Sequence, residues 1–165
     1  MSMDPWPRLV ADVMLGRLAR WLRLAGLDVV YDPSWDDDHL LRRAVQEQRI
    51  LLTRDRPLYQ RARRMNVPAL FVRSDRLTDQ FPEVCRDLGL DPDGLPWFAR
   101  CALCNERIQP IRRDLVRHVV PDYVWRHHRQ FYRCPACDRI YWAGSHYRRM
   151  MGLRARWARS TEPSP

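Results

Sequence analysis

The chain contains no lysine: all 29 of its basic residues are arginine, against 20 acidic residues. No apolar run approaches the roughly 20 residues needed to span a bilayer, which argues against a membrane-embedded protein. The glycine-rich phosphate loop, the dinucleotide-binding fingerprint and the nucleophile elbow are also absent. These absences argue against an enzyme that uses a nucleotide cofactor.

Residues 1–8 lack the charged-then-apolar pattern of a secretory signal, so we expect a cytoplasmic protein. In that compartment the five cysteines are expected to be metal ligands or buried thiols rather than disulfides. A length of 165 residues suits one ordinary domain, or a domain of about 100 residues with a small additional module.

The positive charge is unevenly distributed. Residues 1–100 hold 16 arginines and 15 acids, a net charge of +1, whereas residues 101–165 hold 13 arginines and 5 acids, a net charge of +8. Arginine binds phosphate bidentately and stacks on bases, although a biased codon composition would also exclude lysine. The asymmetry therefore indicates a nucleic-acid contact surface in the carboxy-terminal third.

Strand and helix patterns alternate about four times in the first 90 residues. Apolar runs predict strands at 9–11, 29–31, 50–53 and 69–72, and helical spacing predicts helices at 14–25, 36–45, 58–65 and 78–88. This alternation predicts an α/β fold with a parallel sheet between flanking helices.

Acidic residues follow three of these strands: Asp12, Asp55 and Asp75, while Asp36, Asp37 and Asp38 open the second helix. The carboxyl ends of parallel strands share one edge of the sheet, so these acids can converge. Clustered carboxylates suit Mg²⁺ or Mn²⁺, which can activate water and stabilise a phosphoryl transition state. The alternative is that they cap helices, as Asp55 could for the helix that follows it.

Three arginines share one side of the first helix, opposite its apolar stripe: Arg17, Arg20 and Arg23. They are expected to form either a solvated helix face or a phosphate-binding ridge. Cys85 lies in an apolar helical pattern and is expected to be a buried thiol.

Two Cys-x-x-Cys pairs, Cys101/Cys104 and Cys134/Cys137, are separated by 29 residues. Four thiolates in this arrangement predict a tetrahedral zinc site, and a site closed by four cysteines is structural rather than catalytic. The competing interpretation, a pair of redox dithiols, is disfavoured because no strand–helix pattern surrounds them.

Aromatic residues alternate with arginines around the second cysteine pair. Such a pattern is typical of surfaces that bind single-stranded nucleic acid, although a small zinc module also needs aromatics for its core. We expect Tyr132 and Trp142 to pack inside and His146 to be exposed. Residues 160–165 are expected to form a disordered tail.

Several of these segments together resemble the Mut-seven C-terminal RNase domain family, with the motifs in the same order over roughly residues 8–150. The matching segments are 12–23, 50–56, both cysteine pairs and 141–146. The resemblance implies a PIN-like nuclease fold with a zinc ribbon and metal-dependent cleavage of RNA. It implies PIN-type acids at Asp12, Asp55, Asp75 and the start of the second helix, where Asp37 fits best and Asp38 is the second choice. PIN enzymes often carry glutamate at that helix position, where this chain has aspartate.

We therefore predict a PIN-like nuclease domain over 1–96 and a zinc-ribbon module over 97–159, acting together as a ribonuclease. The predicted metal sites and RNA contacts are Mg²⁺ or Mn²⁺ on Asp12, Asp37, Asp55 and Asp75, structural Zn²⁺ on Cys101, Cys104, Cys134 and Cys137, and RNA on Arg17, Arg20, Arg54 and His146. The alternatives are a non-catalytic zinc-ribbon RNA-binding or adaptor protein, and a toxin-like nuclease held by an inhibitor. The sequence carries no signal that selects a protein partner or a homo-oligomer.

Overall fold

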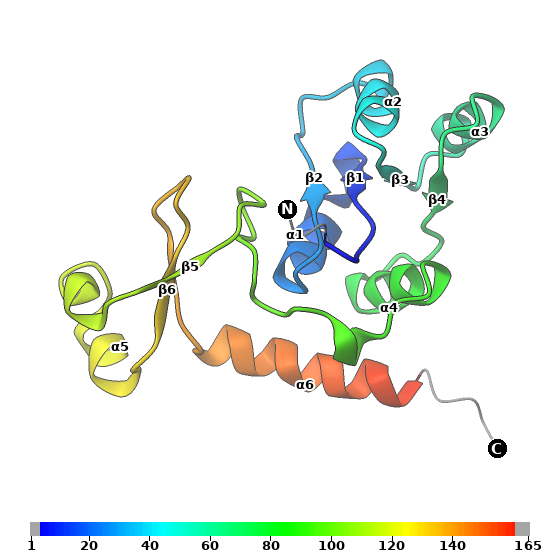
Figure 1. Cartoon of the computed structure of the whole chain (residues 1–165). Coiled ribbons are helices and arrows are strands. Elements are labelled where there is room, and N and C mark those ends of the chain that lie inside the picture. Colours follow the sequence, from blue (N-terminus) through cyan, green and yellow to red (C-terminus); the bar gives the residue numbers. More distant parts are fainter. Residues whose placement is uncertain (1–3, 161–165) are drawn as a thin grey trace.

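A four-stranded parallel sheet, with strand order β2-β1-β3-β4, forms the centre of the computed structural model, which describes residues 4–160 (Figure 1). Its strands are β1 (Leu9–Ala11), β2 (Val29–Val30), β3 (Ile50–Thr53) and β4 (Ala69–Phe71). The helices of this part are η1 (Val13–Leu15), α1 (Gly16–Leu24), α2 (Asp37–Gln46), α3 (Arg56–Arg64), α4 (Leu77–Asp87) and η2 (Pro92–Gly94). The predicted α/β class is confirmed, and the first predicted helix begins with a separate 3₁₀ turn.

The sheet is covered by helices on both faces because its strands are apolar on both faces. Leu9 and Leu52 belong to the core beneath α1 and α4. Val10 and Leu51, their neighbours in sequence, pack instead under α2 and α3. Successive strand residues point to opposite faces, so the sheet lies between two helical layers.

Gly26 lets the chain pass very close to itself after α1. Its φ is +93°, and a Cβ at this position would lie 2.3 Å from the Pro96 carbonyl oxygen. Only glycine fits such a backbone approach without strain. The segment that leads out of the first unit is therefore held against the end of α1.

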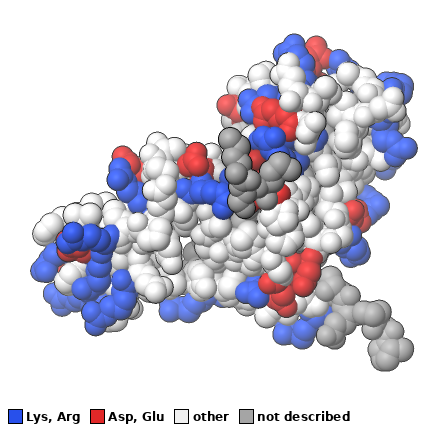
Figure 2. Space-filling view, viewed as in Figure 1, with Lys and Arg blue, Asp and Glu red and all other residues white. Residues whose placement is uncertain are grey.

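The second sheet is antiparallel, with order β5-β6-β7. It contains β5 (Gln109–Ile111), β6 (Phe131–Arg133) and β7 (Ile140–Tyr141), with η3 (Arg113–Val116) and α5 (Asp122–His127) between β5 and β6. Val116, Val120 and Phe131 form its small core. We call residues 99–144 the ribbon. Arginine side chains gather at its α5 end, at the left of Figure 2.

The last helix, α6 (Ser145–Ser160), runs from the ribbon back across the first unit (Figure 1). Trp157 is 6% exposed and belongs to the α1/α4 core, where its ring stacks 4.4 Å from that of Phe81. Arg154 forms an ion pair with Asp93 at 2.8 Å. The contacts of α6 thus cross the predicted boundary at residue 96. The predicted tail begins at Ser160, the last residue of α6, and residues 161–165 lie outside the described residues.

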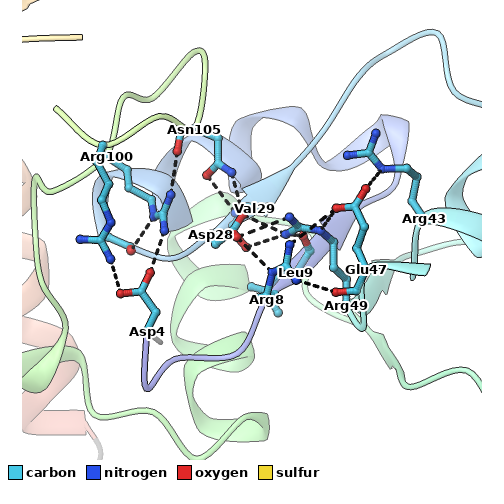
Figure 3. A network of polar contacts seen from close by, with 12 residues as sticks. Asp4, Arg8, Leu9, Asp28, Val29, Arg43, Glu47, Arg49, Arg100 and Asn105 are labelled. Carbon is cyan, nitrogen blue, oxygen red and sulfur yellow. Dashed lines mark hydrogen bonds and ion pairs between the residues drawn. The ribbon is translucent and has the colours of Figure 1, made fainter. Parts of the chain in front are cut away.

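The amino edge of the sheet, where the strands begin, is held by a network of acids and arginines (Figure 3). Asp28 accepts hydrogen bonds from Arg49 at 2.8 Å, Arg8 at 3.3 Å and the Asn105 side chain at 2.7 Å. Arg49 also donates to Glu47 at 2.6 Å. Burial raises the pKa of Asp28, but the hydrogen bonds from Arg49 and Asn105 outweigh it and leave the pKa below its usual value.

The amino-terminal segment joins the same region to the ribbon. Asp4 accepts a hydrogen bond from Arg100 at 2.8 Å and pairs with Arg107. Arg100 in turn donates to the Gly26 carbonyl at 3.2 Å. These contacts fix the ribbon against the amino edge of the sheet.

Across residues 4–160, we find no helix with both the length and the apolar character that crossing a membrane requires.

Candidate functional site

The carboxyl edge of the sheet contains a topological switch point between β1 and β3. The chain leaves β1 toward β2 through α1 on one face, and leaves β3 toward β4 through α3 on the other. A crevice forms at such a point, and α/β proteins bind ligands there. The sequence places Asp12 directly after β1, and Thr53 and Asp55 at the end of β3.

Asp12 is 4% exposed and is fixed by hydrogen bonds to both of its oxygens. Its Oδ1 accepts from the Val13 N–H at 2.6 Å, and its Oδ2 accepts from the Thr53 hydroxyl at 2.6 Å. The Asp55 N–H donates to the Thr53 Oγ1 at 2.9 Å. In this second hydrogen bond the Thr53 hydroxyl is the acceptor. Its own proton is therefore available for the bond to Asp12, in which Thr53 is the donor. The buried threonine thus orients the carboxylate.

Asp55 caps α3, as the alternative interpretation predicted. Its Oδ1 accepts from the Leu58 N–H at 2.8 Å, and a proline follows in the first turn of the helix. A carboxylate has four lone-pair sites on two oxygens, so one cap does not exhaust it. Capping and metal binding are therefore compatible at this residue.

Two of the three adjacent aspartates at the start of α2 have partners of their own. Asp36 caps the helix by accepting from the His39 N–H at 2.7 Å. Asp38 forms an ion pair with Arg61 of α3. Asp37, between them, has neither kind of contact. Of the three aspartates it is therefore the one free to bind a ligand at the carboxyl edge.

Asp37 experiences the charges of the other two acids. Burial raises its pKa first, and the negative charges of Asp55 and Asp12 raise it further, against a smaller opposing effect of Arg61. Because the charges of Asp55 and Asp12 act on Asp37, we call these three residues the acid group.

Asp75 and Arg54 were predicted for different roles, but they pair with each other. Arg54 also donates to the backbone carbonyls of Arg73 and Ser74, so it braces the loop after β4. The Asp75 side chain is 88% exposed, and Asp75 is not among the charges that most affect the pKa of Asp37. In this arrangement Asp75 is therefore an exposed partner of Arg54.

The four cysteines of the ribbon converge on one point, with their sulfur atoms all within 4.8 Å of one another. The Cys101 and Cys137 sulfurs are 3.8 Å apart. Tetrahedral Zn²⁺ with Zn–S bonds of about 2.3 Å has sulfurs about 3.8 Å apart, so this cluster could hold zinc. Within residues 4–160 no other group of three or more cysteine, histidine or carboxylate ligands is gathered in this way.

The two cysteine pairs have the same backbone pattern. In each, the N–H of the first cysteine donates to the carbonyl five residues on: Cys101 to Glu106 at 2.8 Å and Cys134 to Arg139 at 2.9 Å. In each, the residue after the second cysteine has positive φ: +67° for Asn105 and +61° for Asp138. Asn and Asp are the residues other than glycine that most readily adopt this conformation. The repeated turn explains the position of both polar residues.

The environment of Cys101 favours its thiolate. Burial raises the pKa of Cys101, but the Tyr141 hydroxyl, at 3.0 Å from the sulfur, and the backbone N–H groups of Cys104 and Leu103 lower it to about 7. At Cys104, burial and the neighbouring Cys137 and Cys101 raise the pKa to about 12. A cation would be needed to hold all four sulfurs as thiolates.

Arg23 corrects the prediction for the first helix. It was expected on an exposed side with Arg17 and Arg20, but it is buried and donates to the carbonyls of Val29, Ala102 and Leu103 at 2.8, 3.1 and 2.9 Å. The first cysteine turn therefore covers this arginine. Cys85 is fully buried as predicted, and burial raises its pKa to about 12.

A cleft of about 980 Å³ lies between α1, the ribbon and α6, and we call it the α1–ribbon cleft. It brings together three residues predicted to contact RNA, namely Arg17, Arg20 and His146, all of them exposed. Tyr132 and Trp142 also line it and are half-buried, so they combine packing with an accessible surface.

Sequence reasoning missed the roles of two tyrosines. The Tyr31 hydroxyl donates to the Val13 carbonyl at 2.9 Å and so braces the turn after Asp12. The Tyr141 hydroxyl accepts from the Ala102 N–H at 3.2 Å beside the cysteine cluster. Tyr31 directly follows β2, and a polar tip at the carboxyl end of a strand was the signal that could have revealed it.

The fold and the site define a doubly wound α/β protein with carboxylates at its switch point and a four-cysteine module attached. A family model described as the Mut7-C RNAse domain matches residues 7–153, which is most of the chain. The protein therefore belongs to the Mut7-C RNAse domain family, as the sequence motifs implied. Comparisons with curated proteins and with solved structures find no match.

Proposed function

We propose that this protein is a ribonuclease that hydrolyses RNA phosphodiester bonds with Mg²⁺ or Mn²⁺ held at the acid group. The observation that carries the proposal is the position of Asp12 and Asp55 at the carboxyl ends of the neighbouring strands β1 and β3, where the Thr53 hydroxyl orients Asp12. Membership of an RNase domain family supports RNA as the substrate. The ribbon, with zinc on its four cysteines, supplies the positive surface that positions the RNA.

The chemistry of the acid group fits a hard divalent cation. Its ligand atoms are oxygens only, from three carboxylates and the neighbouring Thr53 hydroxyl, which suits Mg²⁺ and Mn²⁺. Burial and then repulsion by Asp55 and Asp12 raise the pKa of Asp37, and a bound cation would relieve the repulsion. Mg²⁺ commonly binds through one or two carboxylates and keeps several waters, so the acids need not touch one another.

A divalent cation supplies the charge that stabilises the phosphoryl transition state and the acidity that activates the attacking water. The chain contributes the positions of its ligands. Thr53 holds the Asp12 carboxylate by donating to its Oδ2, and the Leu58 N–H holds Asp55. Asp75 is the fourth predicted acid, and its pair with Arg54 uses only its Oδ1.

The test is RNA cleavage by single asparagine variants in Mg²⁺ or Mn²⁺. We expect Asp12→Asn, Asp37→Asn and Asp55→Asn to lose at least about 100-fold in rate, because even residues one step removed from a metal typically contribute 10–100-fold. Asp38→Asn changes the same charge one residue away, on a side chain that is paired with Arg61, and should retain most activity. Cleavage by Asp12→Asn and Asp55→Asn at the parent rate would disprove the proposal.

The second candidate is a non-catalytic RNA-binding or adaptor protein. It is favoured by the capping roles of Asp12 and Asp55, which give both acids a structural purpose. It predicts RNA binding by the parent without Mg²⁺ or Mn²⁺ and no cleavage with either metal. Metal-dependent cleavage that is lost in Asp12→Asn would exclude it.

A further inference from the structure

We infer that the α1–ribbon cleft is a binding site for unpaired nucleotides of an RNA strand, which directs the proposed nuclease toward single-stranded RNA. The inference deepens the proposed function and rests on it for the link to cleavage. The binding site itself depends on three observations that do not involve the acid group: unpaired arginines, accessible aromatic rings and a strained aromatic residue.

The cleft is positively charged without compensation. Arg17, Arg20, Arg139 and Arg149 all line it, and no acidic residue does. Within the described residues 4–160, none of these four forms an ion pair with a carboxylate, whereas the arginines of the amino edge do. Exposed guanidinium groups without carboxylate partners are suited to phosphates, which they can bind bidentately.

The same cleft is lined by aromatic rings that are only half-buried. Trp97, Phe98, Tyr132, Trp142 and Tyr147 each keep part of their surface accessible. Aromatic rings beside arginines are the arrangement by which proteins bind unstacked bases and the adjoining phosphates. In a duplex the bases are paired and stacked, so they cannot present their faces to such rings. The cleft therefore suits an unpaired segment.

Phe98 is held in a conformation that aromatic residues rarely adopt. Its φ is +62°, its N–H donates to the Leu24 carbonyl at 2.6 Å, and its ring lies 4.4 Å from that of Tyr147. The other non-glycine residues with positive φ are all polar Gln, Asn or Asp residues. Backbone strain at a bulky side chain is characteristic of functional sites, and here it aims an aromatic ring into the cleft.

The cleft is also close enough to the acid group to share one RNA strand with it. Arg17 and Arg20 lie five and eight residues after Asp12, in the first turns of α1. Five residues of chain span at most about 18 Å, so the backbone of Arg17 lies within that distance of Asp12. A strand whose unpaired bases occupy the cleft can therefore continue along α1 to the carboxyl edge.

The experiment measures binding of a labelled eight-nucleotide single-stranded RNA and of a blunt duplex of equal length, by fluorescence anisotropy. All variants carry Asp12→Asn so that cleavage does not interfere, and circular dichroism checks their folding. Tyr147→Ala should bind the single strand roughly 5- to 100-fold more weakly, the range expected when one stacking partner is lost. Tyr147→Phe keeps the aromatic ring and should bind the single strand about as tightly as the protein with Tyr147. Tyr123→Ala, which removes a 69%-exposed tyrosine on α5, should leave it unchanged.

The arginines are tested through the salt dependence of the same binding. Log affinity falls with log salt, and each phosphate contact to a single strand contributes about 0.7 to the steepness of that fall. The double variant Arg17→Gln with Arg20→Gln should therefore reduce the steepness by about 1.4. Arg86→Gln, an exposed arginine on α4 outside the cleft, is the matched control. The inference is overturned if the duplex binds as tightly as the single strand, or if the tyrosine and arginine variants bind like the parent.

These outcomes separate the cleft from the nuclease. If cleft variants lose single-strand binding while the parent cleaves no RNA in Mg²⁺ or Mn²⁺, the cleft stands and the proposed function fails. If the parent cleaves RNA while cleft variants bind normally, the proposed function stands and the cleft inference fails.

Discussion

The two edges of the parallel sheet use the same residue types in opposite ways. At the amino edge, Asp28 and Glu47 are surrounded by arginines, and their pKa values lie below the usual range. At the carboxyl edge, Asp37 faces other acids, and its pKa lies above the usual range. The acids at the start of the strands are thus paired with arginines, whereas at the end of the strands Asp37 lies among other acids.

This difference indicates which edge stabilises the fold and which is available for chemistry. An acid whose partners are protein cations stabilises the folded state. An acid whose pKa is raised by burial and by neighbouring acids, as that of Asp37 is, opposes folding at neutral pH unless a cation joins it, and such shifts are characteristic of functional sites.

Loss of the zinc proposed for the cysteine cluster should release the ribbon from the amino edge, since the turn of the first cysteine pair positions Asn105 against Asp28. Cys101→Ser with Cys134→Ser should abolish zinc binding, which contributes roughly 10 kcal/mol or more in small zinc modules. Hydrogen exchange should then show loss of protection in the ribbon strands, with the parallel sheet still protected. Metal content by mass spectrometry provides the second readout.

The fifth cysteine provides the control for that experiment. Cys85→Ala should keep one zinc per chain, because Cys85 is buried in the α1/α4 core, away from the cluster. Equal loss of zinc in Cys85→Ala, or unchanged ribbon protection in the double serine variant, would contradict the assignment.

Arg49→Ala should be the most destabilising single change at the amino edge. Arg49 is 4% exposed and binds Asp28, Glu47 and the Leu9 carbonyl. Removing one partner of a buried ion pair costs about 3–5 kcal/mol, because a buried charge is left uncompensated. Urea unfolding followed by tryptophan fluorescence measures the change.

Arg61→Ala is the counterpart at the carboxyl edge. Its pair with Asp38 is largely exposed, so the expected loss is about 0–1 kcal/mol. Similar losses for Arg49→Ala and Arg61→Ala would remove the distinction between the two edges.

Much of this arrangement could be predicted from sequence because it is local. Strands covered on both faces are continuous apolar runs, so β1 and β3 were found together with the acids that follow them. The Cys-x-x-Cys spacing likewise predicted a cluster that the fold then assembled. Asp37 was preferred over its neighbours by family resemblance, and the contacts of Asp36 and Asp38 now supply a physical reason.

The features that were missed depend on distant parts of the chain. Helical periodicity placed Arg23 on an exposed side, but it cannot show that the first cysteine turn folds over that side. The helix α6 was not predicted, although Met150, Leu153 and Trp157 recur at helical spacing among many arginines. Its apolar residues find their partners in the core formed by residues about 60–140 positions earlier, as Trp157 does.

The dependence of the free energy of unfolding on pH in the acidic range should be set by the carboxylates of the amino edge. A carboxyl group whose pKa is lowered by folding stabilises the protein above its unfolded pKa, and this contribution is lost as the pH falls through the folded pKa. Asp28, Asp4 and Glu47 all have lowered pKa values. Stability should therefore decline as the pH falls below about 4.

Asp28→Asn isolates one of these groups. At pH 7 it should cost about 1–2 kcal/mol, and the difference from the parent should shrink as the pH falls toward 2.5, because the parent carboxylate becomes protonated too. Urea midpoints across this range measure it. A difference that stays constant with pH would show that the charge of Asp28 is not the source of the stabilisation.

Asp37→Asn should have the smallest effect on stability and the opposite sign. Because folding raises the pKa of Asp37, its contribution favours the folded state at low pH and is lost as the pH rises through the folded pKa. At pH 7 without metal, removing this charge should stabilise the protein by a few tenths of a kcal/mol, since solvent screens the exposed side chain.

Mg²⁺ or Mn²⁺ should raise the Tm of the parent by binding the folded state, and should raise that of Asp37→Asn far less. Asp122→Asn, an exposed acid on α5, should keep the full metal response. If Asp37→Asn instead destabilised the metal-free protein by more than about 1 kcal/mol at pH 7, Asp37 would belong with the acids that stabilise the fold, as those of the amino edge do.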